Sequence, residues 1–139
     1  MGCCNSAVIP APADKVWATI RNFHDLSWSA NVVQKVDVVG DASGVEISAK
    51  RKLNDAFSET LLGLDDEAHQ IRYSIDDGPG AVSRDNVLGY VGQVQVFPIT
   101  EDNTSLVLWT SVWSGGEGAK EFCDPIYQGL LGDLKAHFA

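Results

Sequence analysis

The chain ends in AKEFCDPIYQGLLGDLKAHFA, residues 119–139, and this stretch decides the fold. It is the one segment long and periodic enough to predict a full-length helix. Its apolar residues recur at helical spacing: Phe122, Cys123, Ile126, Tyr127, Leu130, Leu131 and Leu134. The opposite face carries Lys120, Asp124, Gln128 and Asp133. Because one helix cannot bury an apolar face alone, the upstream chain is expected to provide a surface for it.

Most of the upstream chain has the two-residue period of β-strands. A short first strand is predicted at residues 7–9, and six more at residues 32–39, 44–53, 57–64, 70–75, 87–97 and 104–113. Two short helical segments are expected between the first and second strands, one after Pro12 and one around Trp28. This order predicts an α+β fold in which a curved antiparallel sheet packs against the last helix and leaves a cavity between them.

Two connections are informative. The Asn54-Asp55 pair predicts a hairpin turn between two strands. The longest stretch without periodicity, residues 76–86, has Gly78-Pro79-Gly80 at its centre, and a loop of this length in a compact domain is often functional. The cavity is expected to open between this loop and the last helix.

Length and composition exclude several classes of function. With 139 residues, the chain has the length of one domain, spanning residues 1–139. The formal net charge of -9 argues against a nucleic-acid partner, since residues 50–52 form the only basic run. No apolar run is long enough for a transmembrane helix. Cys3, Cys4 and Cys123 cannot build a disulfide framework, which favours a reducing, cytoplasmic location.

The first six residues, MGCCNS, fit the short pattern for N-myristoylation at Gly2, with neighbouring cysteines available for a second acyl chain. The pattern is short and matches by chance often. The favoured interpretation is therefore an ordinary frayed terminus, with acylation at Gly2 as the alternative.

Several short motifs, taken in order, carry a family resemblance. They are IPAPADKVW at 9–17, DLSW at 25–28, Glu59 followed by LLGLD at 61–65, Tyr73, Gly78-Pro79, Tyr90, Trp109 and YQGLLGDLK at 127–135. From about Ala7 to Phe138 the chain resembles the START/Bet v1-like (SRPBCC) superfamily, and within it the polyketide cyclase/dehydrase and lipid-transport group. The resemblance implies a helix-grip fold, a seven-stranded curved antiparallel sheet around a long C-terminal helix, with a hydrophobic cavity inside.

Candidate ligand-binding residues follow from strand parity and from this resemblance. Alternate residues of a strand share a face, which groups Phe57 with Glu59 and Trp109 with Trp113, and the family analogy turns both sets toward the helix. The expected pocket is mainly aromatic with a few polar groups: Trp28, Arg51, Phe57, Glu59, Tyr73, Tyr90, Trp109, Trp113, Phe122 and Ile126. The alternative is that the aromatic residues are simply core.

Glu59 and Arg51 have three possible roles. Both are expected on inward faces of neighbouring strands, where a buried carboxylate needs a partner to stay ionised. Paired, they would either orient a polar group of a ligand or serve the structure alone. The third alternative places both at the rim of the sheet, in water.

No catalytic constellation or cofactor motif is found. His24, His69 and His137 lack metal-ligand spacing, so no metal is assigned, and only His24 is placed near a pocket mouth. No nucleophile with its base is recognised, and no cofactor is expected. Gly129 and Gly132 weaken the last helix, which predicts close approach of the helix to the sheet or to a ligand; the alternative is a tolerated weak spot.

Three functions remain open. The favoured one is a monomer or weak dimer that binds a small hydrophobic molecule, such as a lipid, polyketide-like or isoprenoid compound, in the cavity. The second is a polyketide cyclase or dehydratase that uses the same cavity, with Glu59, Arg51 or a tyrosine as acid or base. Related proteins often carry an inward arginine where this chain has Ala49, which argues against the enzyme. The third is a partner-regulating module whose 76–86 loop closes over a ligand.

Overall fold

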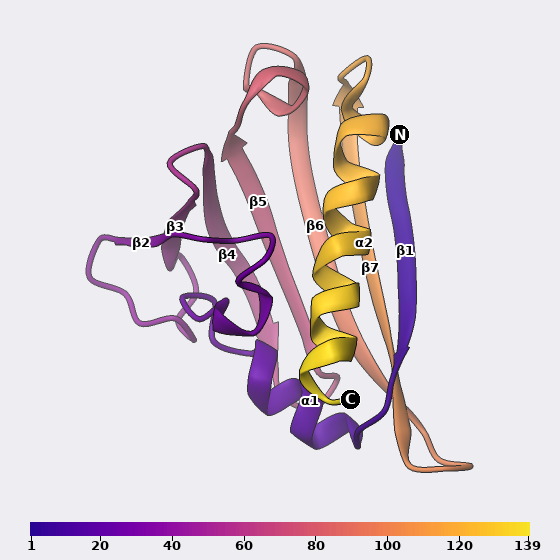
Figure 1. Ribbon diagram of the computed structural model, residues 1–139. Helices are drawn as coiled ribbons and strands as arrows, with labels where there is room; N and C mark the ends of the chain where they lie inside the picture. The colour runs from indigo at the N-terminus through magenta and orange to yellow at the C-terminus, as the bar shows by residue number, and fades with distance from the viewer.

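The computed structural model describes residues 1–139, and the C-terminal stretch forms one long helix, α2 (Ala119–His137). The helix lies across one face of a sheet, with its axis along the strands (Figure 1). Gly118, in the left-handed region at φ 82°, precedes the helix and turns the chain into it. The predicted helix and its apolar stripe are therefore both present.

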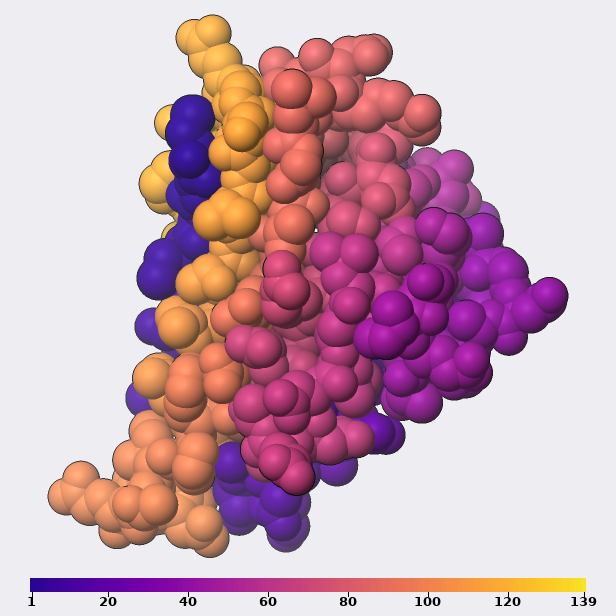
Figure 2. Space-filling view, turned by 180° about the vertical axis from the view of Figure 1, so that it is seen from behind, coloured from indigo at the N-terminus to yellow at the C-terminus, as the bar shows by residue number.

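The sheet has seven antiparallel strands in the order β1-β7-β6-β5-β4-β3-β2. The strands are β1 (Gly2–Ile9), β2 (Val36–Val39), β3 (Lys50–Leu53), β4 (Phe57–Asp65), β5 (Gln70–Asp77), β6 (Val87–Ile99) and β7 (Thr104–Gly115). From β2 to β7 each strand pairs with the next along the chain, and β1 closes the series by pairing with β7. Seen from behind, the strands lie side by side with no helix over this outer face (Figure 2).

Three short helices complete the fold: α1 (Ala13–Ile20), η1 (Ser27–Ser29) and η2 (Gly80–Val82). Pro12 precedes α1, which buries Val16 and Trp17 against the end of the sheet. The Trp17 indole N–H donates to Asp66 Oδ1 at 2.8 Å, and this bond ties α1 to the turn after β4. Neither α1 nor α2 is long and apolar enough to cross a membrane.

Two of the strands predicted from periodicity are shorter in the structure. Residues 32–35 form turns before β2, and residues 44–49 form turns before β3. Val45 and Ile47 alternate with polar residues but are exposed, at 39% and 55%. Ser48 has φ 75°, which interrupts an extended strand, and the Phe23 amide donates to the Gly44 carbonyl at 2.8 Å. Residues 44–47 therefore leave the sheet, whereas Ser48 and Ala49 still exchange backbone hydrogen bonds with Leu61 of β4 at 2.9 and 2.8 Å.

The expectation of a frayed N-terminus is wrong. The first strand begins at Gly2 and pairs with β7 along its whole length. Even the Met1 carbonyl accepts a hydrogen bond from the Trp113 amide at 3.0 Å. Cys3 is buried, and its burial, reinforced by Asp124, raises the pKa of the thiol to about 11. Cys4 is exposed on the other face of the strand.

The helix α2 is rotated from the orientation that the four-residue repeat suggested. Its deeply buried residues are Ala119, Cys123, Tyr127, Leu130, Leu131 and Leu134, whereas Ile126 is half-buried and Phe122 is 36% exposed. A Cβ at Gly129 would lie 3.0 Å from Val32 Cγ2, and one at Gly132 would meet nothing. Close approach therefore applies to Gly129 alone, and its neighbour is a side chain of the 32–35 segment instead of the sheet.

Candidate functional site

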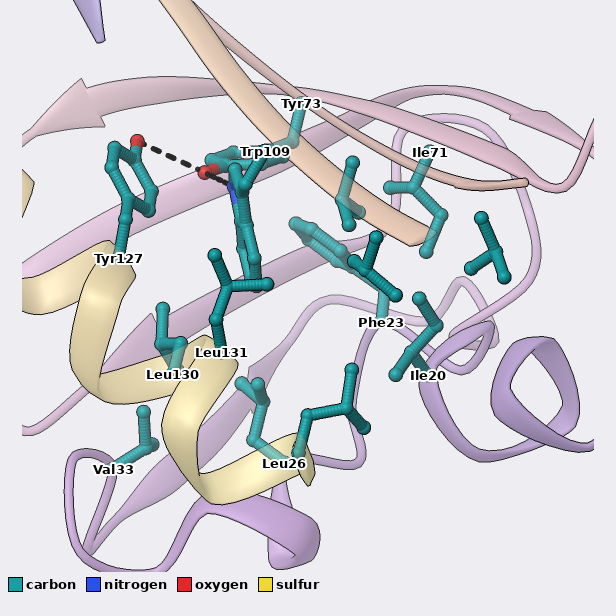
Figure 3. Close-up of a cluster of buried hydrophobic side chains, with 14 of the residues drawn as sticks. Ile20, Phe23, Leu26, Val33, Ile71, Tyr73, Trp109, Tyr127, Leu130 and Leu131 are labelled. Carbon is teal, nitrogen blue, oxygen red and sulfur yellow. Dashed lines mark hydrogen bonds between the residues drawn. The ribbon is translucent and has the colours of Figure 1, made fainter. Parts of the chain in front are cut away.

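A cavity of about 130 Å³ lies between α2 and the inner face of the sheet. Its wall is mostly hydrophobic, with one polar side formed by β3 and β4. The lining residues are Leu26, Val32, Val33, Arg51, Leu53, Asn54, Phe57, Glu59, Tyr73, Ile75, Trp109, Cys123, Ile126, Tyr127 and Leu130. Figure 3 shows part of this wall, with Tyr127 and Leu130 projecting from α2 toward Trp109 on the sheet.

The structure brings six of the candidate ligand-binding residues together at the cavity: Arg51, Phe57, Glu59, Tyr73, Trp109 and Ile126. The other four lie elsewhere. Trp28 lines a separate, smaller void of about 20 Å³. Tyr90 and Trp113 stack on each other with ring centroids 5.3 Å apart, beyond the cavity wall. Phe122 stacks on Phe57 at 6.3 Å, on the outer side of that ring.

Arg51 and Glu59 face each other across β3 and β4 and form a buried ion pair. Arg51 Nε donates to Glu59 Oε1 at 2.8 Å, and Arg51 Nη2 lies 2.7 Å from the same oxygen. Arg51 Nη1 donates to the Phe23 carbonyl at 2.8 Å, and the guanidinium lies over the Phe23 ring at 3.7 Å from its centroid. With exposures of 7% and 5%, the two residues are not at a wet rim, so that alternative is wrong.

Next to this pair, three tyrosine hydroxyls form a continuous hydrogen-bonded chain. The Trp109 indole N–H donates to Tyr73 Oη at 2.9 Å, and Tyr73 Oη lies 3.2 Å from Tyr127 Oη (Figure 3). Tyr127 Oη bonds in turn to Tyr90 Oη, which donates to Cys123 Sγ at 3.7 Å. Burial raises the pKa of each of these tyrosines well above the usual value, and their mutual proximity adds to the effect.

The position of Tyr73 depends on a glycine in the next strand. Gly92 lies opposite Tyr73 in the β5–β6 ladder, and the tyrosine ring packs directly over it. A Cβ at position 92 would come within 2.6 Å of Tyr73 Cε1. Because Gly92 has no side chain, the Tyr73 ring can occupy this position at the cavity wall.

Comparison with known proteins identifies the family. Residues 5–139 match the sequence profile of the family described as polyketide cyclase / dehydrase and lipid transport. The chain belongs to this family. A protein of known structure from Nitrosospira multiformis is 37% identical to it, with a TM-score of 0.98 over 100% of this chain and 97% of that one. A search of curated proteins gave no match.

More distant structures share the fold of this chain. XoxI from Bacillus cereus is 24% identical, with a TM-score of 0.79 over 99% of this chain and 94% of that one. Ginseng major latex-like protein 151 from Panax ginseng is 14% identical, also with a TM-score of 0.79, over 100% of this chain and 97% of that one. The seven-stranded Bet v1-like helix-grip architecture is thus confirmed, and the family supports hydrophobic-ligand binding or a cyclase-like role.

Sequence reasoning missed several lining residues. Cys123, Tyr127 and Leu130 stood on the recognised apolar stripe of the last helix, and Leu53 and Ile75 share inward parity with Arg51 and Tyr73 respectively. The remaining four lie in irregular segments, where neither helical spacing nor strand parity predicts which side chains face the cavity: Leu26, Val32, Val33 and Asn54. The Asn54-Asp55 turn itself was predicted, and both residues have the positive φ that a tight hairpin requires.

The 76–86 loop does not border the cavity as the sequence suggested. No residue of the Gly78-Pro79-Gly80 loop lines it. Leu26 and Val33 line both the cavity and a surface groove of about 350 Å³, whose other residues are His24, Asp25, Ser27, Ala30, Gln34, Lys35 and Val36. His24 makes no hydrogen bond to a residue that lines the cavity. Its Nε2 is hydrogen-bonded to the backbone carbonyl of Lys50 at 3.0 Å.

Neither a metal centre nor a nucleophile with its base is formed. No group of three or more His, Cys, Asp or Glu side chains is arranged to hold a metal ion. Burial raises the pKa of the Cys123 thiol, so the one cysteine at the cavity is a poor nucleophile. Besides Cys123, the lining residues with polar side-chain atoms are Arg51, Asn54, Glu59, Tyr73, Trp109 and Tyr127.

Proposed function

We propose that this protein is a single ligand-binding domain that holds a small, largely apolar molecule in the cavity without converting it. The observation that carries the proposal is an apolar cavity with one polar side, made by Arg51 and Glu59. This is the usual composition of a small-molecule site, in which apolar walls supply affinity and a few polar groups supply orientation. All three cysteines are free, which supports a reducing, cytoplasmic setting.

The volume of the cavity limits the size of the ligands that it can hold. A volume of about 130 Å³ is close to the roughly 150 Å³ of an engineered apolar cavity that binds benzene, and below the roughly 300 Å³ or more of typical ligand sites. A single ring or a short branched chain therefore fits within the cavity. A longer lipid, polyketide-like or isoprenoid chain requires Phe57 and Phe122, or Leu26 and Val33, to move aside.

The polyketide cyclase or dehydratase alternative has less support. An acid-base catalyst works best with a pKa near the working pH, and the tyrosine pKa values are raised away from that range. The charge of Arg51 is already balanced by the Glu59 carboxylate, which weakens its power to polarise a substrate. The regulatory alternative is weaker still, because the 76–86 loop does not line the cavity.

Titration with toluene, followed by protein NMR, tests the proposal. We expect saturable binding, with shift changes confined to cavity-lining residues. Ile75→Phe should fill the cavity and weaken binding at least tenfold, because the half-buried Ile75 lines it. The matched control is Ile47→Phe, at an exposed position outside the cavity, which should bind toluene normally. Equal binding by both variants, or none by the parent protein, would contradict the proposal.

A further inference from the structure

Three of the five N–H donors of Arg51, one on each guanidinium nitrogen, are directed at protein acceptors. Its Nε and Nη2 are directed at Glu59 Oε1, and its Nη1 donates to the carbonyl oxygen of Phe23. The Phe23 ring covers one face of the guanidinium. The positive charge therefore has its counter-ion and each guanidinium nitrogen has a partner, so Arg51 is poorly placed to recognise a second anion.

Glu59, by contrast, has an unused acceptor. Both short contacts from Arg51 reach Oε1, and Oε2 takes part in no hydrogen bond. Oε2 is not among the fully enclosed atoms that lack a partner, which are the indole nitrogens of Trp28 and Trp113. Since Glu59 lines the cavity and is otherwise buried, the free oxygen is open to the cavity. A carboxylate oxygen left without a donor in an apolar space is unfavourable.

The remaining polar groups of the wall are largely satisfied by one another or by the backbone. Trp109 donates to Tyr73 and Tyr90 donates to Cys123, so the hydroxyl protons between them are used along the tyrosine chain. The Asn54 amide donates to the Val32 carbonyl, and its oxygen accepts from two backbone amides. The wall keeps a few unused N–H groups on Arg51 and Asn54, and Glu59 Oε2 is its one charged group with no partner.

From this geometry we infer that the ligand is a small apolar molecule carrying a neutral hydrogen-bond donor, such as an alcohol or phenol hydroxyl, which Glu59 Oε2 accepts. The inference rests on the proposed function and specifies its ligand class. It excludes carboxylic acids, because their carboxylate would face the Glu59 carboxylate in a space of low polarity. It also excludes ammonium compounds, since the adjacent guanidinium already supplies the one balancing positive charge.

Three ring compounds of similar size test the inference at neutral pH: toluene, phenol and benzoate. Toluene and phenol differ only by a methyl in place of the hydroxyl. By titration calorimetry or NMR we expect phenol to bind about tenfold more tightly than toluene, as a hydrogen bond to a charged acceptor would give. Benzoate is expected to bind more weakly than toluene.

Variants assign the preference to the ion pair. In the double variant Arg51→Met/Glu59→Met, which replaces a buried pair by apolar residues of similar volume, the phenol-to-toluene affinity ratio should fall to about one. The matched control is Lys50→Met/Thr60→Met on the same two strands, where the side chains bond to each other at 2.9 Å on the exposed face. That control should keep the tenfold ratio.

The outcomes separate the two proposals. If toluene binds but phenol binds no more tightly, or benzoate binds best, the inference about the donor is overturned while the apolar binding site stands. If no compound of the three binds, the proposed function itself is overturned. Should the double variant fail to fold, Glu59→Gln serves instead, because it keeps an acceptor for Arg51 and removes the charged oxygen; an unchanged phenol preference there would also overturn the inference.

Discussion

The wall of the cavity depends on single residues, both on those whose side chains line it and on a glycine whose missing side chain leaves room for a neighbour. Gly92 illustrates this, because its missing side chain leaves the space that the Tyr73 ring occupies. From that position Tyr73 accepts the Trp109 hydrogen bond and reaches Tyr127 on α2. One glycine in β6 thus determines how the sheet meets the helix at the cavity.

We therefore expect Gly92→Ala to destabilise the protein by about 1–3 kcal/mol, the usual range for overpacking a well-filled core. Its added methyl group would overlap the Tyr73 ring, which must move and break its bond to Trp109. Denaturant unfolding gives the stability, and near-UV circular dichroism reports the aromatic cluster. Gly63→Ala is the control in β4, where the added Cβ would meet only Arg72 Cβ at 3.9 Å; equal losses in both variants would rule out the steric explanation.

At the level of the element, the helix α2 is stabilised by packing of its buried apolar stripe, while several of its residues have low helix propensity. Cys123, Tyr127, Leu131 and Leu134 are all buried. Within the same helix, Pro125 removes a backbone donor, and two glycines add conformational freedom to the unfolded chain. Packing against the sheet and the 32–35 segment therefore has to stabilise a helix of modest intrinsic propensity.

The two glycines should respond differently to substitution. Gly132→Ala is expected to stabilise the protein by roughly 1 kcal/mol, because a helical alanine is favoured over glycine and the added Cβ meets no atom. Gly129→Ala should gain less, or lose stability, because its Cβ would press on Val32 Cγ2 at 3.0 Å. Midpoints of urea unfolding measure both. A larger gain at Gly129 than at Gly132 would show that the packing against Val32 is unimportant.

For the whole molecule, the three tyrosines of the chain all belong to one buried cluster that joins β5, β6 and α2. Each has its pKa raised in the folded state, first by burial. An unfolded tyrosine has a pKa of about 10. The folded protein therefore holds more protons than the unfolded chain above that pH, and the stability that the neutral hydroxyls provide is present below pH 10 and lost as the pH rises above it.

This linkage predicts cooperative alkaline unfolding. Above about pH 10, the free energy of unfolding should fall by up to about 1.4 kcal/mol per pH unit for each tyrosine. Because no tyrosine lies outside the cluster, tyrosinate absorbance should rise only together with the loss of far-UV circular dichroism. A tyrosine that ionises near pH 10 while the circular dichroism stays native would show that the cluster is open to solvent.

The sequence determined the main architecture because its signals are local periodicities. The stripe on residues 119–139, the alternation of the later strands and the Asn54-Asp55 turn each report which face of an element is buried, and together with the family motifs they led to the helix-grip fold. Strand parity likewise placed Arg51 and Glu59 on inward faces, where they are paired. Alternation failed at residues 44–47, because the Phe23–Gly44 hydrogen bond and the positive φ of Ser48 end the strand early, and neither is visible in a local pattern.

Only the tertiary structure decided the distance between the helix and the sheet. That distance in turn sets the volume of the cavity. Its volume of about 130 Å³ depends on the rotation of α2, on the Tyr73–Gly92 contact and on irregular segments that bring in Val32 and Val33. These are long-range packing distances, and a periodicity carries no information about them. The same holds for the free Glu59 oxygen, since the choice of a single carboxylate oxygen by Arg51 depends on side-chain geometry that strand parity does not encode.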